Sequence, residues 1–174
     1  FLGSFLADVI DQYIAILRAN PSVSEAYEQE VVDVSTPEEI LKQLQENLQD
    51  FPEGPQVTYR VDYLDPSVAN DSIMAYYLEP PIDDLRNNVI KINKDNIGDT
   101  NTLYGTLAHE GFPGHLYQIT WFLNTNPNPL RAALSNIGYT EGWAMYVEVN
   151  QYAKSSLSAD VAKLQALDTT LGYV

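Results

Sequence analysis

The chain has no cysteine and only two histidines among its 174 residues. The absence of cysteine excludes disulfide bonds, thiolate metal sites and a cysteine nucleophile. No apolar run approaches the roughly 20 residues that a membrane-spanning helix needs, so we expect no transmembrane segment. Positive charge is also scarce, with nine Lys and Arg against 24 Asp and Glu, for a formal net charge of −15. Because such a surface repels phosphate backbones, nucleic acid is not an expected partner.

The bulk composition is that of a globular protein. Apolar residues make up 45% of the chain and aromatic residues 11%, which is typical of a folded domain. We find no internal repeat, low-complexity tract or domain boundary, and therefore predict a single domain over residues 1–174. The chain begins at Phe1 and stops close behind a helical pattern, so we expect it to be a piece of a longer protein.

Two helices are predicted in the first third of the chain. Residues 1–19 carry apolar side chains at helical spacing, which favours a helix packed on the core, with a partner-binding helix as the alternative. The stretch "STPEEILKQLQENLQDF" has a clear start. Thr36 can cap this helix, Pro37 suits its first turn, and Glu39 completes a capping box.

The apolar period changes in the middle of the chain and then returns to helical. Residues 56–64, 72–81 and 87–94 read as three short strands, for which we expect a small antiparallel sheet. Helical patterns follow over 101–110, from Pro129, over 138–154 and over 158–171. The predicted fold class is α+β, mostly helical with one small sheet.

Both histidines lie in "LAHEGFPGHLYQ", residues 107–118, where Glu110 follows His109 and His115 comes six residues after His109. Neutral imidazole is a common zinc ligand, and a carboxylate beside the metal can deprotonate its bound water. In the usual H-E-x-x-H arrangement, a spacing of four places both rings on one face of a helix.

The segment between the two histidines departs from that arrangement. Six residues turn a regular helix by about 600°, which leaves the two rings on different faces. Gly111 and Gly114 permit unusual backbone angles, and Pro113 disfavours helix at Phe112. The sequence therefore predicts a break or bulge over 111–114 that restores the register. The alternative is two separate helices joined by a turn, with the histidines near each other in sequence only.

A third ligand is available further along the chain. Glu141 lies 26 residues after His115, at the distance typical of zinc hydrolases that take a glutamate from a later helix. Glu148 follows on the same face of that helix. Because Trp143 and Tyr146 share the helix, we expect part of it to be buried, where a carboxylate needs a cation. The alternative for both glutamates is a solvated face.

Three stretches together, "AYYLEPP", "HEGFPGHLYQ" and "YTEGWAMYVE", resemble the bacterial family called domain of unknown function 885. The family pattern is H-E-x-x-P-G-H-x-x-Q followed by E-G-W-A-x-Y-x-E, and the match covers about residues 73–150. This family is mostly helical and resembles the gluzincin metallopeptidases, which implies a zincin-like catalytic core. It also implies an extracellular or cell-envelope location, with the cytoplasm as the alternative.

The resemblance implies Zn2+ bound by His109, His115 and Glu141, with Glu110 as the catalytic base. The expected activity is hydrolysis of peptides or oligopeptides. Gln118 and Glu148 are expected to support a ligand or the substrate from outside the ligand set. Gluzincins also use a residue beyond the third ligand to stabilise the oxyanion, for which the candidates here are Tyr146, Tyr152 and Tyr173.

Three expectations remain open from the sequence. An exposed edge strand lines the cleft in zincins and pairs with extended peptide; residues 89–93 and 72–78 are the two candidates. A metal-binding or sensor domain without catalysis is one alternative to the hydrolase. A structural fragment with no metal is the other.

Overall fold

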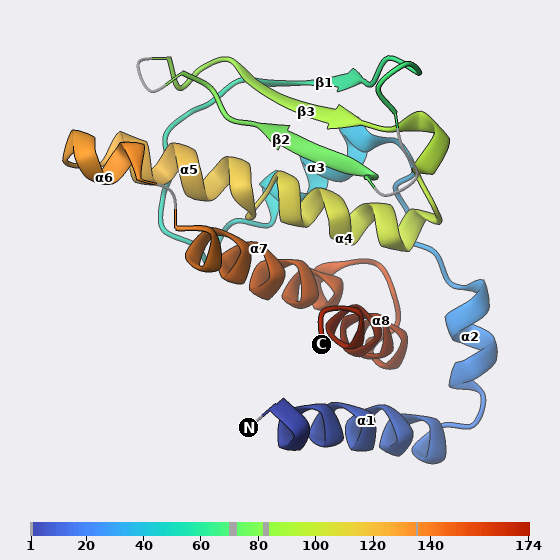
Figure 1. Cartoon of the computed structure of the whole chain (residues 1–174). Coiled ribbons are helices and arrows are strands. Elements are labelled where there is room, and N and C mark those ends of the chain that lie inside the picture. The colour runs from blue at the N-terminus through green and yellow to red at the C-terminus, as the bar shows by residue number, and fades with distance from the viewer. Residues whose placement is uncertain (1, 70–72, 82–83, 135) are drawn as a thin grey trace.

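The computed structural model describes residues 2–69, 73–81, 84–134 and 136–174. It confirms an α+β fold in which helices dominate and one three-stranded sheet lies on top of them (Figure 1). The elements are α1 (Leu2–Ala19), α2 (Val23–Gln29), α3 (Pro37–Glu46), β1 (Tyr59–Tyr63), β2 (Ala75–Leu78), β3 (Asn88–Ile92), α4 (Thr100–Glu110), α5 (His115–Asn124), α6 (Pro129–Ala133), α7 (Ile137–Gln151) and α8 (Ala159–Gly172), with short 3-10 turns at Lys94–Asn96 and Tyr152–Lys154.

The start of α3 forms as the sequence predicts. The Thr36 hydroxyl accepts a hydrogen bond from the Glu39 backbone N–H, and the Glu39 carboxylate accepts one from the Thr36 N–H. This reciprocal pair satisfies two backbone donors that a helix otherwise leaves unpaired. Ile40, Leu41 and Leu44 are then fully buried, so the predicted apolar face is the one that packs.

The first helix packs only in part. Val9 and Ile16 are buried, whereas Leu2, Phe5 and Ile10 on the same apolar pattern are exposed. Helix α1 contacts α8 and, more weakly, α2. The expected core-facing helix is therefore present, but the described chain covers only part of its apolar face.

The sheet differs from the expected antiparallel arrangement. The strand order is β1–β3–β2, with β2 antiparallel to β3 but β1 parallel to β3. The prediction is therefore wrong for the β1–β3 pair. The chain forms the β2–β3 hairpin and then places the returning strand, β3, beside β1. Four of the five β3 residues are buried, and a strand buried on both faces belongs in the middle of a sheet.

This order decides which strand lies at the edge near the motif. Residues 89–93 belong almost entirely to the central strand, so their prediction as a cleft-lining edge is wrong. The other candidate, residues 72–78, forms edge strand β2 from Ala75 onward, and its first residue lies outside the described part of the chain.

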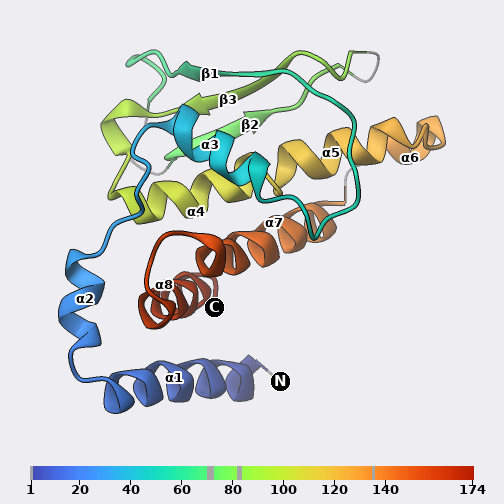
Figure 2. The same ribbon diagram turned by 180° about the vertical axis from the view of Figure 1, so that it is seen from behind.

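The elements stack in layers that both views show (Figure 1, Figure 2). The sheet lies above α3 and α4, α4 packs on α7, α7 on α8, and α8 on α1. Strand β2 also contacts α4, so the end of α4 lies between the sheet and α7. Within the part of the chain that the structure describes, none of the helices combines the length and the apolarity that crossing a membrane requires.

Candidate metal centre

The two histidines flank a break between helices. Helix α4 ends at Glu110 and α5 begins at His115. Gly111 (φ −105°, ψ −101°) and Gly114 (φ −75°, ψ −136°) both lie outside the helical region, and the peptide bond between Phe112 and Pro113 is cis. The predicted departure from regular helix over 111–114 is therefore confirmed.

Gly114 lets α5 start directly against the end of α4. A Cβ on this residue would lie 1.7 Å from the carbonyl oxygen of His109 and 2.4 Å from that of Ala108. The turn is also held from α7, because Trp143 Nε1 donates to the carbonyl of Pro113 at 2.8 Å. The segment therefore forms two separate helices joined by a turn, as the alternative interpretation expected. The turn nevertheless brings the imidazole rings of His109 and His115 close together, with 4.8 Å between their centroids.

Glu141 completes a cluster of three possible ligands. Its carboxylate oxygens lie 3.4 Å from Nε2 of His109 and 3.4 Å from Nε2 of His115. One donor atom from each of the three residues lies within 4.8 Å of the other two. Four ligands arranged tetrahedrally at about 2.0–2.2 Å from an ion are themselves roughly 3.4 Å apart. The donor types and their spacing therefore fit one metal ion with room for a further ligand.

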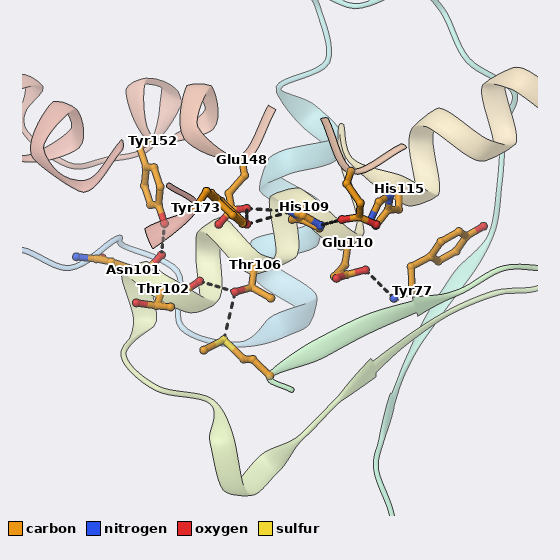
Figure 3. Close-up of polar contacts among 12 residues, drawn as sticks. Tyr77, Asn101, Thr102, Thr106, His109, Glu110, His115, Glu148, Tyr152 and Tyr173 are labelled. Atoms are coloured by element: carbon orange, nitrogen blue, oxygen red, sulfur yellow. Dashed lines mark hydrogen bonds and ion pairs between the residues drawn. The ribbon is translucent and has the colours of Figure 1, made fainter. Parts of the chain in front are cut away.

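The other ring nitrogen of His109, Nδ1, also has a partner. Its Nδ1 lies 2.9 Å from Oε2 of Glu148, a residue that is buried (Figure 3). The Tyr173 hydroxyl donates to the same oxygen at 2.6 Å and lies 3.5 Å from Nδ1. Burial, followed by the hydrogen bond to Glu148, raises the pKa of Tyr173, so the hydroxyl is a donor at neutral pH. With Nδ1 turned to Glu148, the ring presents Nε2 to Glu141.

Glu110 stands apart from the ligand cluster. Its Oε2 accepts a hydrogen bond from the backbone N–H of Tyr77, on edge strand β2, at 2.8 Å (Figure 3). Burial raises the pKa of Glu110 to about 7, although the charge of His109 and the Tyr77 hydrogen bond both act to lower it. A carboxylate with a pKa near neutrality can both accept and return a proton.

The two imidazoles have pKa values displaced in opposite directions. Burial lowers the pKa of His109, but the hydrogen bond to Glu148 raises it, and the charges of Glu110, Glu148 and Glu141 add to a net increase. Burial lowers the pKa of His115, and the charge of His109 lowers it further. His115 is thus the more readily available of the two as a neutral nitrogen ligand.

Gln118, expected to support a ligand or the substrate, makes no side-chain hydrogen bond to the three possible ligands in the described part of the chain. Both polar atoms of its side-chain amide are buried and have no hydrogen-bond partner among the described residues. These two atoms are also inaccessible to solvent. The amide is thus left with unused donor and acceptor capacity one turn after His115.

The three tyrosines suggested by the sequence occupy different surroundings. The Tyr152 hydroxyl is buried and donates to the carbonyl of Asn101, and Tyr146 is largely exposed. Only Tyr173 reaches the cluster, from the Nδ1 side of His109. Sequence reasoning missed the Tyr77 N–H and the pairing of Tyr173 with Glu148, since both depend on contacts between separate elements.

The comparisons with known proteins agree with this picture of the fold. The chain matches the crystal structure of a protein from Colwellia psychrerythraea, named there a "putative lipoprotein", at 22% identity and a TM-score of 0.68. The match covers 97% of this chain but 33% of that one, so the chain spans about a third of the length of this relative. No curated protein matches. A family model described as "Bacterial protein of unknown function (DUF885)" matches residues 3–169, and the chain therefore belongs to this bacterial family.

Proposed function

We propose that the chain carries the metal centre of a zinc-dependent peptide hydrolase, with His109, His115 and Glu141 as ligands and Glu110 as general base. The observation that supports this most strongly is the convergence of two Nε2 atoms and one carboxylate from three different helices. Glu110 follows a ligand directly in sequence but points to β2 instead of to Glu141. The arrangement, with three metal ligands and a separate glutamate as base, resembles that of gluzincin metallopeptidases.

The donor set favours zinc among the common metals. Two imidazole nitrogens and one carboxylate suit Zn2+ better than Mg2+ or Ca2+, which prefer oxygen ligands. Three protein ligands are the number found in catalytic zinc sites, whereas structural sites use four. When bound, the ion supplies a Lewis acid that polarises a carbonyl and acidifies a water molecule.

The protein's own contribution to the reaction centres on Glu110. Its carboxylate takes the proton from the attacking water and delivers it to the leaving amine, which needs a pKa close to the working pH. Burial places the pKa in that range. The Tyr77 N–H holds one carboxylate oxygen in position, so the base is oriented before a substrate arrives.

Edge strand β2 offers a place for the peptide. Tyr77 pairs with Ile90 in the β2–β3 ladder, yet its N–H is used by Glu110. The backbone groups of Tyr77 and of Ala75 therefore point to the open edge, because outward and inward positions alternate along a strand. An extended peptide pairing at this edge brings its backbone next to Glu110.

We also propose a cell-envelope location for the complete protein. The family is bacterial, and the solved relative carries the name of a lipoprotein. Fractionation of the native bacterium into cytoplasm, membrane and periplasm, followed by immunoblotting, tests this. Recovery in the cytoplasmic fraction would contradict it.

The metal proposal is tested first by elemental analysis of protein purified without an affinity tag. We expect close to one zinc per chain, and loss of that zinc in His109→Ala, His115→Ala and Glu141→Ala. Glu79→Ala, at an exposed glutamate just beyond β2, is the control and should retain the metal. Wild-type protein without bound metal would favour a structural fragment.

Catalysis is tested separately in the complete gene product, with a peptide library as substrate. Glu110→Gln keeps the size of the side chain and removes the base. We expect zinc affinity to stay within about tenfold and hydrolysis to fall by about 10² or more. Undiminished hydrolysis would exclude Glu110 as the base, and zinc binding without any hydrolysis would favour the sensor alternative.

A further inference from the structure

We propose that Tyr173 is a positioning residue for the metal ligand His109 and that it acts through Glu148. This inference rests on the proposed metal centre. It brings α8, which contributes no ligand, into the construction of the site.

The contact geometry is compact. Oε2 of Glu148 lies 2.9 Å from His109 Nδ1 and 2.6 Å from the Tyr173 hydroxyl, and the hydroxyl lies 3.5 Å from Nδ1. One carboxylate oxygen thus receives two hydrogen bonds from two different elements (Figure 3). The imidazole N–H comes from the end of α4, and the phenol comes from Tyr173, the C-cap residue that directly follows α8.

Glu148 needs more than one contact to hold an imidazole still. Its side chain has several rotatable bonds, and a single hydrogen bond leaves the carboxylate free to pivot. The Tyr173 hydroxyl fixes the same oxygen from a second direction. Oε2 of Glu148 is therefore held from two directions.

A fixed carboxylate behind an imidazole sets which ring nitrogen is available. Nδ1 carries the hydrogen that Glu148 accepts, so the lone pair is on Nε2, which faces Glu141 at 3.4 Å. Outer hydrogen-bond partners of this kind orient metal ligands and commonly account for 10- to 100-fold in metal affinity. Tyr173 strengthens the orientation of His109 indirectly, through its hydrogen bond to Glu148.

The position of the hydroxyl separates this role from stabilisation of an oxyanion. The phenol meets the His109 ring at Nδ1, whereas Glu141 approaches Nε2, on the other side of the ring. Tyr173 is accordingly placed to act on a ligand of the metal. Its removal should change metal affinity and the state of the imidazole as well as any turnover.

The test is a double-mutant cycle on zinc affinity, measured by competition with a chelating dye. Tyr173→Phe should weaken zinc binding by up to about tenfold, and Glu148→Gln by about 10- to 100-fold. Adding Tyr173→Phe to Glu148→Gln should cost less than about twofold more, because the hydroxyl then has no carboxylate to hold. Tyr146→Phe, at an exposed tyrosine of α7, is the matched control and should leave the affinity unchanged.

A second measurement does not depend on zinc. The 15N shifts of the His109 ring in metal-free protein, at a pH where the ring is neutral, should show hydrogen on Nδ1 in the wild type and a mixture of tautomers in Tyr173→Phe. Unchanged tautomer and affinity in Tyr173→Phe would overturn the inference, as would fully additive losses in the cycle. If the wild type binds no zinc while the tautomer still shifts, the proposed function fails and the Tyr173 contact stands.

Discussion

The candidate metal centre has two halves that differ in how firmly they are held. The inner half, defined by His109 and Glu148, lies where α4 packs on α7, and the Glu148 side chain is only 9% exposed. The outer half, defined by His115 and Glu141, lies at the beginnings of α5 and α7, and the Glu141 side chain is 46% exposed. Ile137, one turn before Glu141, is 73% exposed.

The difference indicates a division of labour within one site. In the inner half Nδ1 of His109 lies 2.9 Å from Oε2 of Glu148, and the Tyr173 hydroxyl donates to the same oxygen, so the imidazole is oriented before an ion binds. In the outer half the Glu141 carboxylate lies 3.4 Å from both imidazoles, but the side chain is 46% exposed, so it has more room to adjust. A preformed ligand beside an adaptable one suits a centre that must bind an ion and still leave room for a substrate.

The largest expected effect comes from breaking the link between the two halves. In Gly114→Ala the new Cβ would collide with the backbone carbonyls of His109 and Ala108, so α5 must shift. We expect the free energy of unfolding to fall by about 3 kcal/mol or more, as measured by urea denaturation. Gly142→Ala is the control, because a Cβ there meets nothing within 4 Å. Equal stability of the two variants would show that the turn tolerates a side chain.

A bound metal ion should connect the outer half to the inner half and thereby stabilise the fold. At free zinc near 100 times the Kd, we expect the free energy of unfolding to rise by about 2.7 kcal/mol and to return on chelation. The same urea titration of Glu141→Ala, which lacks the outer carboxylate, should show little or no gain. A gain in Glu141→Ala as large as in the wild type would place the ion elsewhere.

A smaller loss should follow from disturbing only the inner half. In Gly105→Ala the new Cβ would lie 2.1 Å from the Tyr152 hydroxyl and 3.4 Å from Glu148 Oε1. We expect a loss of about 2 kcal/mol in the free energy of unfolding together with weaker zinc binding. Removing the hydroxyl in Gly105→Ala/Tyr152→Phe should recover part of the stability. If Gly105→Ala loses stability but keeps its zinc affinity, the contact at Gly105 does not affect the position of Glu148.

The smallest effect is expected at the surface of the outer half. Ile137→Ser replaces an exposed side chain, so the free energy of unfolding should change by no more than about 0.5 kcal/mol. Val147→Ser on the same helix is the contrast, because Val147 is fully buried and its loss should cost about 2 kcal/mol. Thermal unfolding of both variants measures the difference. A large loss in Ile137→Ser would mean that the outer half is more tightly packed than its exposure indicates.

Local features of the chain were readable from the sequence because their causes are local. The capping box at Thr36 and Glu39 needs only residues three apart, and the structure contains it. The break over 111–114 follows from the rotation per residue of a helix and from the properties of glycine and proline. The spacing of Glu141 likewise predicted which carboxylate would join the histidines in space.

Other features were decided by tertiary structure, because they depend on which elements pack together. Alternating strand patterns carry no signal of direction, so the parallel β1–β3 pair and the central place of β3 came only with the fold. The contact of Tyr77 with Glu110 joins a strand to a helix 33 residues away, and that of Tyr173 with His109 spans 64 residues. The sequence by itself determined which donor atoms the candidate site offers. The packing of β2, α7 and α8 around α4 determined their orientation, since a side chain's hydrogen-bond partners are set by what lies across from it in space.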